Sequence, residues 1–212
     1  MRNLTKQPEP DVLHDNKVDW LIAYLADQNN KTNKYRYRHP DIKNALRQET
    51  DWKCVYCESS IGHNTPGDVK HKIPSSAART RHFDWDNLTI ACTECNRRKN
   101  SYYSAVKPFL DPYVDDVESR TQHIGPILDC KRDDTDAEIT VKILELHNRE
   151  RVALILKKIE KIEQLNDLYE RYHSAMGTPL GEVIRNQLIK KADQKSEFSG
   201  MVASILAKAG II

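Results

Sequence analysis

The sequence predicts an α+β fold, in which a small core of two strands and one helix lies between two helical regions. Two observations carry this prediction. Two Cys-x-x-Cys pairs, Cys54 with Cys57 and Cys92 with Cys95, enclose short apolar runs that are broken by Gly, Pro, Asn and Ser. After residue 137, apolar residues recur instead at three- and four-residue spacing, which is typical of amphipathic helices.

Five regions follow one another along the chain. The first is polar and contains two prolines, and the last carries apolar residues from Val152 to Tyr172 on one helical face. We therefore expect a disordered tail at 1–14, N-terminal helices at 15–50, a core at 51–110, a connection at 111–136 and a helical region at 137–212.

The N-terminal helices are predicted by a periodic pattern and by a start signal. Val18, Leu21, Ile22 and Leu25 share one face of a helix when they are placed at 3.6 residues per turn. Pro40 stands at the start of a second helical pattern, where its fixed φ and its missing N–H are tolerated.

The composition fits a helix-rich chain outside the membrane. Charged residues make up 30% of the sequence, and the net charge of +2 argues neither for nor against a nucleic-acid partner. No apolar run approaches the ~18 residues that span a bilayer, and the first residues lack the apolar stretch of a secretory signal. We expect a cytoplasmic location, where thiols stay reduced, so the cysteines do not predict a disulfide framework.

The cysteine pairs predict a metal site. Each pair has the two-residue gap at which a tight turn can direct two thiolates at one ion, and two such pairs form the tetrahedral site that structural zinc favours. We therefore assign Cys54, Cys57, Cys92 and Cys95 as ligands of a structural Zn²⁺ ion. The segment between the pairs is longer than in a simple zinc ribbon, so further structure is expected to be inserted there.

The inserted segment carries a second pattern. A strand-like run ends at His71, Asn87 and Leu88 open another strand-like run, and Asn96 follows the second cysteine pair. This order resembles the HNH nucleases of the ββα-metal (His-Me finger) class. Over residues 38–155 the chain is similar to an HNH branch that includes the nuclease subunits of Septu-type and retron-associated anti-phage systems. The resemblance implies a zinc-stabilised ββα-metal core and a metal-dependent endonuclease for DNA, with RNA as the other candidate substrate.

The resemblance also implies roles for single residues. His71 would be the general base that takes a proton from the attacking water, because a neutral imidazole titrates near neutral pH. Asn87 would hold the loop that orients His71. Asn96 would bind a catalytic Mg²⁺ or Mn²⁺ ion, which can neutralise charge on the phosphate and on the leaving oxygen. An ATPase subunit is the implied partner.

Lys70 departs from the family pattern, which usually has Asp or Glu immediately before the histidine as a ligand of the ion. A protonated lysine cannot bind the ion and repels it. Three explanations stay open. Asp68, two residues earlier on the same face of the strand, could reach the metal. Lys70 could itself contact the phosphate while Asn96, water and substrate hold the ion. The third explanation is that the site is inactive, because Lys70 arose in evolution or was introduced by deliberate substitution.

Basic residues gather near the proposed site. Between residues 70 and 107 there are eight basic residues against three acidic ones, although the whole chain is nearly neutral. Such a patch binds phosphates without sequence preference. We predict that nucleic acid is bound by Lys70, Lys72, Arg97, Arg98 and Lys99, and Lys107 belongs to the same basic stretch.

Two hypotheses of function follow. The first is an HNH endonuclease that serves as the nuclease effector of an anti-phage system with an ATPase partner. The second is a zinc-scaffolded subunit that binds nucleic acid or a protein partner and whose nuclease centre has lapsed at Lys70.

Overall fold

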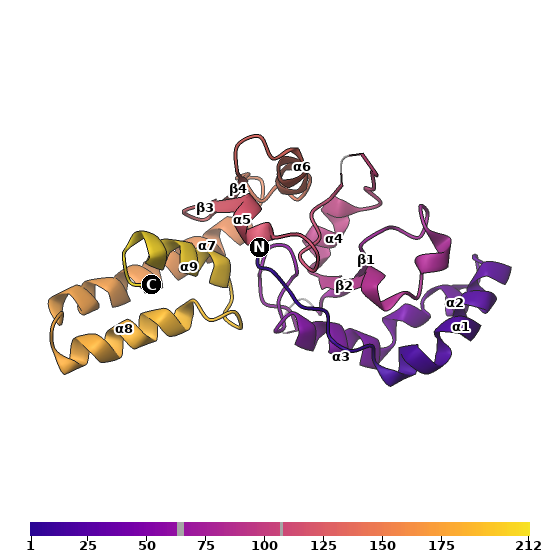
Figure 1. Cartoon of the computed structure of the whole chain (residues 1–212), viewed down its shortest axis with the longest axis horizontal. Helices are drawn as coiled ribbons and strands as arrows, with labels where there is room; N and C mark the ends of the chain where they lie inside the picture. The colour runs from indigo at the N-terminus through magenta and orange to yellow at the C-terminus, as the bar shows by residue number, and fades with distance from the viewer. Residues whose placement is uncertain (63–65, 107) are drawn as a thin grey trace.

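The molecule is elongated, with helices at both ends of a central core (Figure 1). The structure is a computed structural model that describes residues 1–62, 66–106 and 108–212. Helices are the main element, and two antiparallel sheets of two strands each lie near the middle. The prediction of an α+β fold is therefore confirmed.

The core of the fold is a strand–strand–helix unit. β1 (Asp68–His71) pairs antiparallel with β2 (Leu88–Ala91), so that His71 lies opposite Leu88 and Asp68 opposite Ala91. α4 (Thr93–Lys99) follows directly, and Cys92 caps its N-terminus by accepting a hydrogen bond from Cys95 N at 3.4 Å. All four residues of β2 are buried, which explains why its sequence is continuously apolar or small.

The N-terminal helices cover one side of this core. Pro40 stands at the first position of its helix, and the side chain of His39 accepts a hydrogen bond from Asp41 N. Ile42 and Leu46 face inward and are fully buried. The elements of this region are α1 (Asp11–Ala26), α2 (Lys31–Lys34), the 3₁₀ helix η1 (Arg36–Arg38) and α3 (Pro40–Glu49).

The first residues differ from the predicted disordered tail at 1–14. Met1 and Leu13 are buried, and Leu4 N donates to the carbonyl of Pro112 at 2.8 Å. Lys6 Nζ donates to the carbonyl of Leu88 on β2 at 2.8 Å. Residues 11–14 belong to α1, and the residues before them are attached to the core through Met1, Leu4 and Lys6.

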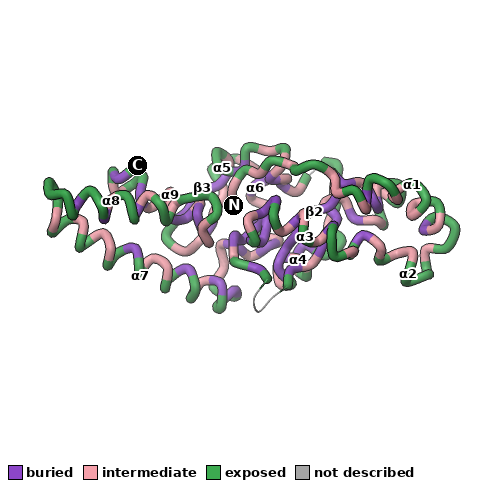
Figure 2. The backbone as a smooth tube through the Cα atoms, turned by 90° about the horizontal axis from the view of Figure 1, so that it is seen from below, coloured by how far each residue is buried: buried purple, intermediate pink, exposed green. Residues whose placement is uncertain are grey.

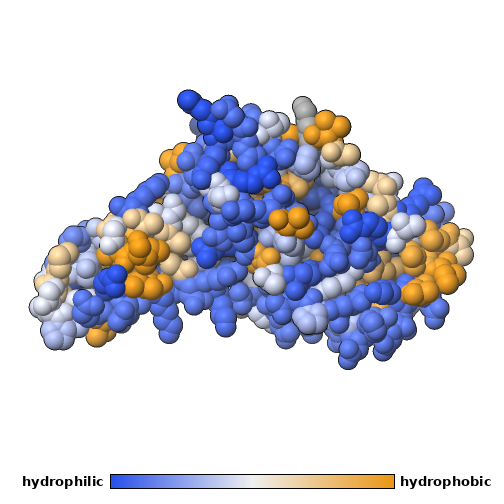
Figure 3. All heavy atoms as spheres, in the orientation of Figure 1, coloured by the Kyte–Doolittle hydropathy of each residue, from blue (hydrophilic) through white to orange (hydrophobic). Residues whose placement is uncertain are grey.

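α1 buries a different face from the one that its sequence suggests. Leu13 and Tyr24 are buried, whereas Val18 and Ile22 are 65% and 63% exposed. Figure 3 shows apolar side chains gathered at the end of the molecule where α1 lies. The spacing of apolar residues identified the helix, but it did not identify the face that packs.

The stretch expected as a connection at 111–136 contains a second small unit. α5 (Val117–Arg120) leads into β3 (Thr121–Ile124), which pairs with β4 (Ile127–Cys130), and α6 (Thr135–Ile143) follows. Gly125 supplies the positive φ of 55° in the turn between the strands. These strands were not predicted, because each is short and no motif of the kind that the cysteine pairs supply marks them in the sequence.

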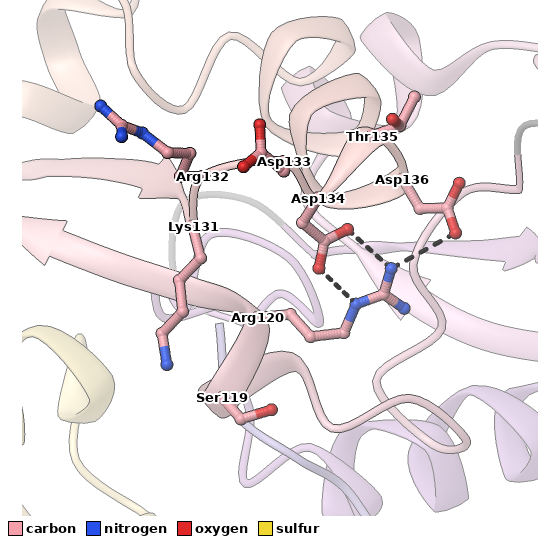
Figure 4. A pocket seen from close by; sticks show the side chains of 8 residues that line it. All are labelled: Ser119, Arg120, Lys131, Arg132, Asp133, Asp134, Thr135 and Asp136. Carbon is pink, nitrogen blue, oxygen red and sulfur yellow. Dashed lines mark hydrogen bonds and ion pairs between the residues drawn. The ribbon is translucent and has the colours of Figure 1, made fainter.

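An ion-pair network joins α5 to the start of α6. Arg120 donates two hydrogen bonds of 2.7 Å to the carboxylate of Asp134 and one of 3.3 Å to Asp136 (Figure 4). The surface beside it is an open hollow of about 450 Å³. Asp134 and Asp136 are engaged by Arg120, so ion pairs that stabilise the fold explain why these carboxylates gather at the hollow.

The C-terminal helices form an arm on the other side of the core. α7 (Val152–Ser174) runs outward from the core, α8 (Pro179–Lys191) runs back beside it, and α9 (Ser199–Lys208) begins near the core and runs outward along the arm (Figure 1). The arm has its own small apolar core, whereas most buried residues lie in the middle of the molecule (Figure 2). The buried residues of the arm's core are Leu165, Leu188, Val202, Leu206 and Ile211.

Glu58 connects this arm to the first cysteine pair. Its buried carboxylate accepts hydrogen bonds from Ser199 Oγ at 3.0 Å and from Gly200 N at 2.9 Å, and its carbonyl accepts one from Phe198 N at 3.3 Å. The start of α9 is therefore attached to the residue that follows Cys57. Among the described residues, no helix is long and apolar enough to cross a membrane.

Candidate functional site

The four predicted zinc ligands come together in the structure. The sulfurs of Cys54, Cys57, Cys92 and Cys95 all lie within 4.8 Å of one another, and all four residues are buried. Cys57 Sγ and Cys92 Sγ are 3.8 Å apart. A tetrahedral ion with Zn–S bonds of about 2.3 Å requires sulfurs about 3.8 Å apart, so the donor set and its spacing fit zinc.

Arg151 completes the surroundings of this cluster and was not identified from the sequence. Its buried guanidinium donates from Nη1 to Cys95 Sγ at 3.2 Å and to the carbonyl of Leu144 at 3.3 Å. Four thiolates around one Zn²⁺ ion carry a net charge of −2, and a buried cation offsets part of that charge. Arg151 immediately precedes α7, so the arm begins at the zinc ligands.

His71 ends β1 in a defined orientation. Its Nε2 lies 2.8 Å from the carbonyl oxygen of His82. A carbonyl can only accept, so Nε2 carries the proton and Nδ1 is left as the acceptor. Burial is the main cause that lowers the pKa of His71 to about 4. The imidazole is therefore neutral at physiological pH and free to accept a proton.

His82 holds the ring of His71 in place, and sequence reasoning did not identify it. Its ring is buried and stacks on His71 with centroids 4.7 Å apart and on Tyr24 with centroids 4.0 Å apart. Its Nε2 donates to the carbonyl of Lys34 at 2.8 Å, and its Nδ1 accepts from Ser75 Oγ at 2.6 Å. Contacts from the N-terminal helices thus fix the loop that carries His82.

Asn87 holds the same loop from the other end. Its Oδ1 accepts from Ile73 N at 2.7 Å, and its Nδ2 donates to the carbonyls of Ile73 and Arg81, both at 3.0 Å. The side chain is fully buried. These contacts brace the loop between β1 and β2.

Asn96 and Lys70 lie at the open side of His71. Asn96 Nδ2 donates to Asp68 Oδ2 at 3.1 Å. Lys70 Nζ donates to the carbonyl of Asn100 at 2.5 Å and lies 3.5 Å from the carbonyl oxygen of Asn96. A pocket of about 190 Å³ is lined by His71, Lys70, Asn96 and Asn100 together with Arg38 of η1.

The part of the sequence that carries this site matches a known family. Residues 54–101 match the model of the HNH endonuclease family. They form an HNH endonuclease domain. The match begins at the first zinc ligand and ends just after α4, so it covers both cysteine pairs and both strands.

Two relatives resemble more of the chain than the HNH domain. The Septu protein PtuB of Bacillus thuringiensis is 28% identical over 218 residues, which cover 97% of this chain and 82% of that protein. The Septu protein PtuB of Bacillus mycoides is 25% identical over 171 residues, which cover 62% of this chain and 58% of that protein. The similarity to the first therefore includes the helical regions on both sides of the HNH domain.

The residues around Asn96 do not fit the resident Mg²⁺ or Mn²⁺ ion that an HNH domain implies. Such an ion requires a shell of oxygen ligands. Among the residues that the structure describes, the carboxylate that contacts Asn96 is that of Asp68, whose Oδ2 accepts a hydrogen bond from the Asn96 amide, and the carbonyl oxygen of Asn100 accepts from Lys70. A lysine ammonium at ~4 Å repels a divalent ion by about 8 kcal/mol at an effective dielectric constant of about 20.

In the described part of the chain, side chains that can bind a metal are clustered at the cysteines and not beside Asn96. Among residues 1–62, 66–106 and 108–212, the four cysteines are the one group of three or more His, Cys, Asp or Glu side chains placed closely enough to hold an ion. The predicted ligands Asp68 and Asn96 are brought together, but as a hydrogen-bonded pair.

The predicted basic residues of the HNH domain have different environments. Lys99 is buried, and its ammonium donates to the carbonyl of Lys72 at 2.8 Å, so it is not placed to bind nucleic acid as predicted. Its long apolar stem packs in the core while the amine finds a backbone acceptor. Burial is the main cause that lowers the pKa of Lys99 to about 8.

The remaining members of this basic set are partly engaged. Lys72 pairs with Asp111 at 2.8 Å, and Arg98 pairs with Glu94 at 2.8 Å and also with Glu145. Arg97 is exposed and contacts Glu94 one turn before it. Lys107 lies outside the described residues. Of the predicted set, Lys70 is the residue that lines the pocket beside His71.

Proposed function

We propose that this protein is an endonuclease that hydrolyses phosphodiester bonds of DNA, with His71 as its general base. The observation that supports the proposal is the hydrogen bond from His71 Nε2 to the carbonyl of His82, because it leaves Nδ1 as the proton acceptor in a residue that lines the pocket. The HNH family match over the same residues supports the same class of reaction.

The residues of the pocket divide into one that reacts and others that position it. His71 Nδ1 takes a proton from a water molecule as the water oxygen attacks the phosphorus atom. The P–O3′ bond then breaks, and the leaving oxygen takes a proton from solvent. Asn87 and His82 keep the imidazole in place through the loop, so they act on geometry.

The predicted Mg²⁺ or Mn²⁺ ion is not part of this mechanism, because the donor set around Asn96 does not fit it. Zinc is proposed as the structural metal of the four cysteines. Its role is to hold the loop before β1 and the start of α4 in fixed relation, and so to keep His71 and Asn96 at the same pocket.

The biological setting is proposed from the relatives. Both are Septu proteins, and the first matches almost the whole length of this chain. We therefore propose a role as the nuclease of an anti-phage system, in the cytoplasm and together with an ATPase subunit. DNA is the proposed substrate, and RNA is the alternative that the assay below includes.

One observation favours a second candidate function. Lys70 replaces the acid expected beside the histidine, and its ammonium is hydrogen-bonded to the C-terminal end of α4. A chain in which this change has ended catalysis would serve as a zinc-scaffolded subunit that binds nucleic acid or a protein partner without cutting.

Conversion of supercoiled plasmid to nicked or linear forms separates the two candidates. The chain alone and the complex purified from its native cells are tested on plasmid DNA and on RNA, with added Mg²⁺ or Mn²⁺ and without either ion. His71→Ala is compared with His14→Ala, which changes an exposed histidine outside the pocket. Cutting that is lost only in His71→Ala supports the proposal. Absence of cutting under every condition favours the binding subunit.

A further inference from the structure

Binding a phosphate in this pocket requires positive charge, and the pocket contains two cationic side chains, those of Lys70 and Arg38. We propose that the ammonium of Lys70 and the guanidinium of Arg38 bind the phosphate and stabilise the charge that develops on it, so that cleavage requires no divalent ion. This inference rests on the proposed nuclease function and specifies what replaces the usual metal.

The lining of the pocket has the electrostatic character of an anion site. Lys70 and Arg38 are its charged residues, and none of the described residues that line it is an Asp or a Glu. The other polar groups come from Asn96, Asn100 and Ser75, which can donate hydrogen bonds to phosphate oxygens. Two cations and neutral donors beside a general base suit a phosphodiester better than a bare divalent cation.

Backbone carbonyl oxygens bind the ammonium group of Lys70. The group has three N–H bonds, of which the carbonyls of Asn100 and Asn96 account for two, at 2.5 and 3.5 Å. Asn100 has a φ of 43°, outside the helical region, because the chain turns there to end α4. The ammonium therefore occupies a cation position built by the protein, and its third N–H is available for a phosphate oxygen.

Arg38 is placed from a separate element. Its Nε donates to Tyr37 Oη at 3.2 Å, and its guanidinium carbon lies 4.3 Å from the centre of the Tyr35 ring. These contacts fix the plane of the guanidinium, and among the described residues no carboxylate pairs with it. Its two terminal amino groups are thus available to a phosphate in the geometry that arginine uses best.

The two cations also act on His71. Burial is the main cause that lowers the pKa of His71, and the positive charges of Lys70 and Arg38 lower it further. A bound phosphate would neutralise this positive field and make the imidazole a stronger base. In the reaction, His71 Nδ1 takes the water proton, the P–O3′ bond breaks, the leaving oxygen is protonated by solvent, and both cations keep their protons.

The test compares cleavage rates with and without divalent ions. Zinc-loaded wild-type protein is assayed in EDTA and in Mg²⁺, and its zinc content is measured after each incubation so that loss of structural metal is recognised. We expect equal rates within about threefold. Lys70→Gln and Arg38→Gln should each lower kcat on the order of 100-fold, the size of effect seen when one donor to a developing charge is removed.

Two further variants separate catalysis from folding and from general charge. Lys70→Arg keeps the positive charge and should retain more activity than Lys70→Gln. Arg79→Gln removes an exposed charge outside the pocket and should leave kcat unchanged. Each variant must keep its zinc and its melting temperature for its rate to be compared.

The outcomes distinguish this inference from the proposed function. Cleavage that EDTA abolishes and Mg²⁺ restores, in protein that has kept its zinc, overturns the inference while the nuclease function stands. A normal kcat in folded Lys70→Gln also overturns it. Failure to cleave under every condition, with or without divalent ions, removes the proposed function itself.

Discussion

Replacing Asn87 with alanine tests whether the loop between β1 and β2 is held in the way the structure shows. The substitution removes three hydrogen bonds, one from Ile73 N at 2.7 Å and two to carbonyl oxygens at 3.0 Å. It leaves a space at a position that is fully buried, so water cannot easily replace the lost partners.

The expected size of the effect follows from these contacts. At about 1 kcal/mol for each buried hydrogen bond, Asn87→Ala should lower the free energy of unfolding by about 3 kcal/mol. For a chain of this length, about 3 kcal/mol corresponds to a fall in melting temperature of about 6 to 12 °C. Because the carbonyl of His82 lies on the same loop, kcat should fall more than the affinity for substrate.

Thermal unfolding and the plasmid assay measure both effects on the same samples. Asn87→Asp keeps the acceptor for Ile73 N but places an oxygen against two carbonyl oxygens, so it should be at least as unstable as Asn87→Ala. Asn44→Ala changes an exposed asparagine on α3 and serves as the control. If Asn87→Ala melted within about 2 °C of the control, the reasoning would be refuted.

Three further predictions concern other parts of the molecule. Arg151→Met should cost about 2 kcal/mol, because a hydrogen bond from a charged group is lost, and should speed zinc release to a chelator; unchanged release would contradict the contact with Cys95. The pKa of His71 is about 4 in the folded protein and near 6.5 when unfolded, so the unfolded chain binds more protons between these values. The free energy of unfolding should therefore decrease as the pH is lowered through this window, by about 2 kcal/mol at pH 5 from His71 alone. Urea unfolding of wild type and His71→Phe at pH 7 and pH 5 measures this difference. Equal pH dependence in the two proteins would oppose the prediction. Leu188→Ala, at a fully buried site in the arm, should cost about 3 kcal/mol and raise hydrogen exchange in α7 and α8, and exchange that rose equally in β1 and β2 would argue against a separate apolar core.

The sequence was sufficient for the parts of the site that depend on local spacing. Two cysteine pairs can reach one ion only if the segments that carry them meet, so the pattern predicted the zinc cluster and the strand–strand–helix unit around it. His71 and Asn87 lie in the same unit, and their roles in catalysis stay predictions.

The remaining parts depend on contacts between residues far apart in the chain. His82 acts through its backbone carbonyl, which no residue type reveals, and Arg151 reaches Cys95 across 56 positions. Lys99 was taken for a surface charge because lysines usually are exposed, but its amine has a backbone acceptor inside the fold. Periodicity in α1 likewise fixed the helix without fixing its buried side, since several faces carry apolar residues.

The attachment of α9 to Glu58 limits how this protein can be dissected. If the chain were expressed only as far as residue 110, the buried carboxylate of Glu58 would lose the two donors near residue 200 and would keep the ammonium of Met1, at 2.6 Å, as its partner. The same fragment would lack Arg151 beside the thiolates. We therefore expect the stretch that matches the HNH family to be less stable when it is separated from the distal helices, even if those helices never touch a substrate.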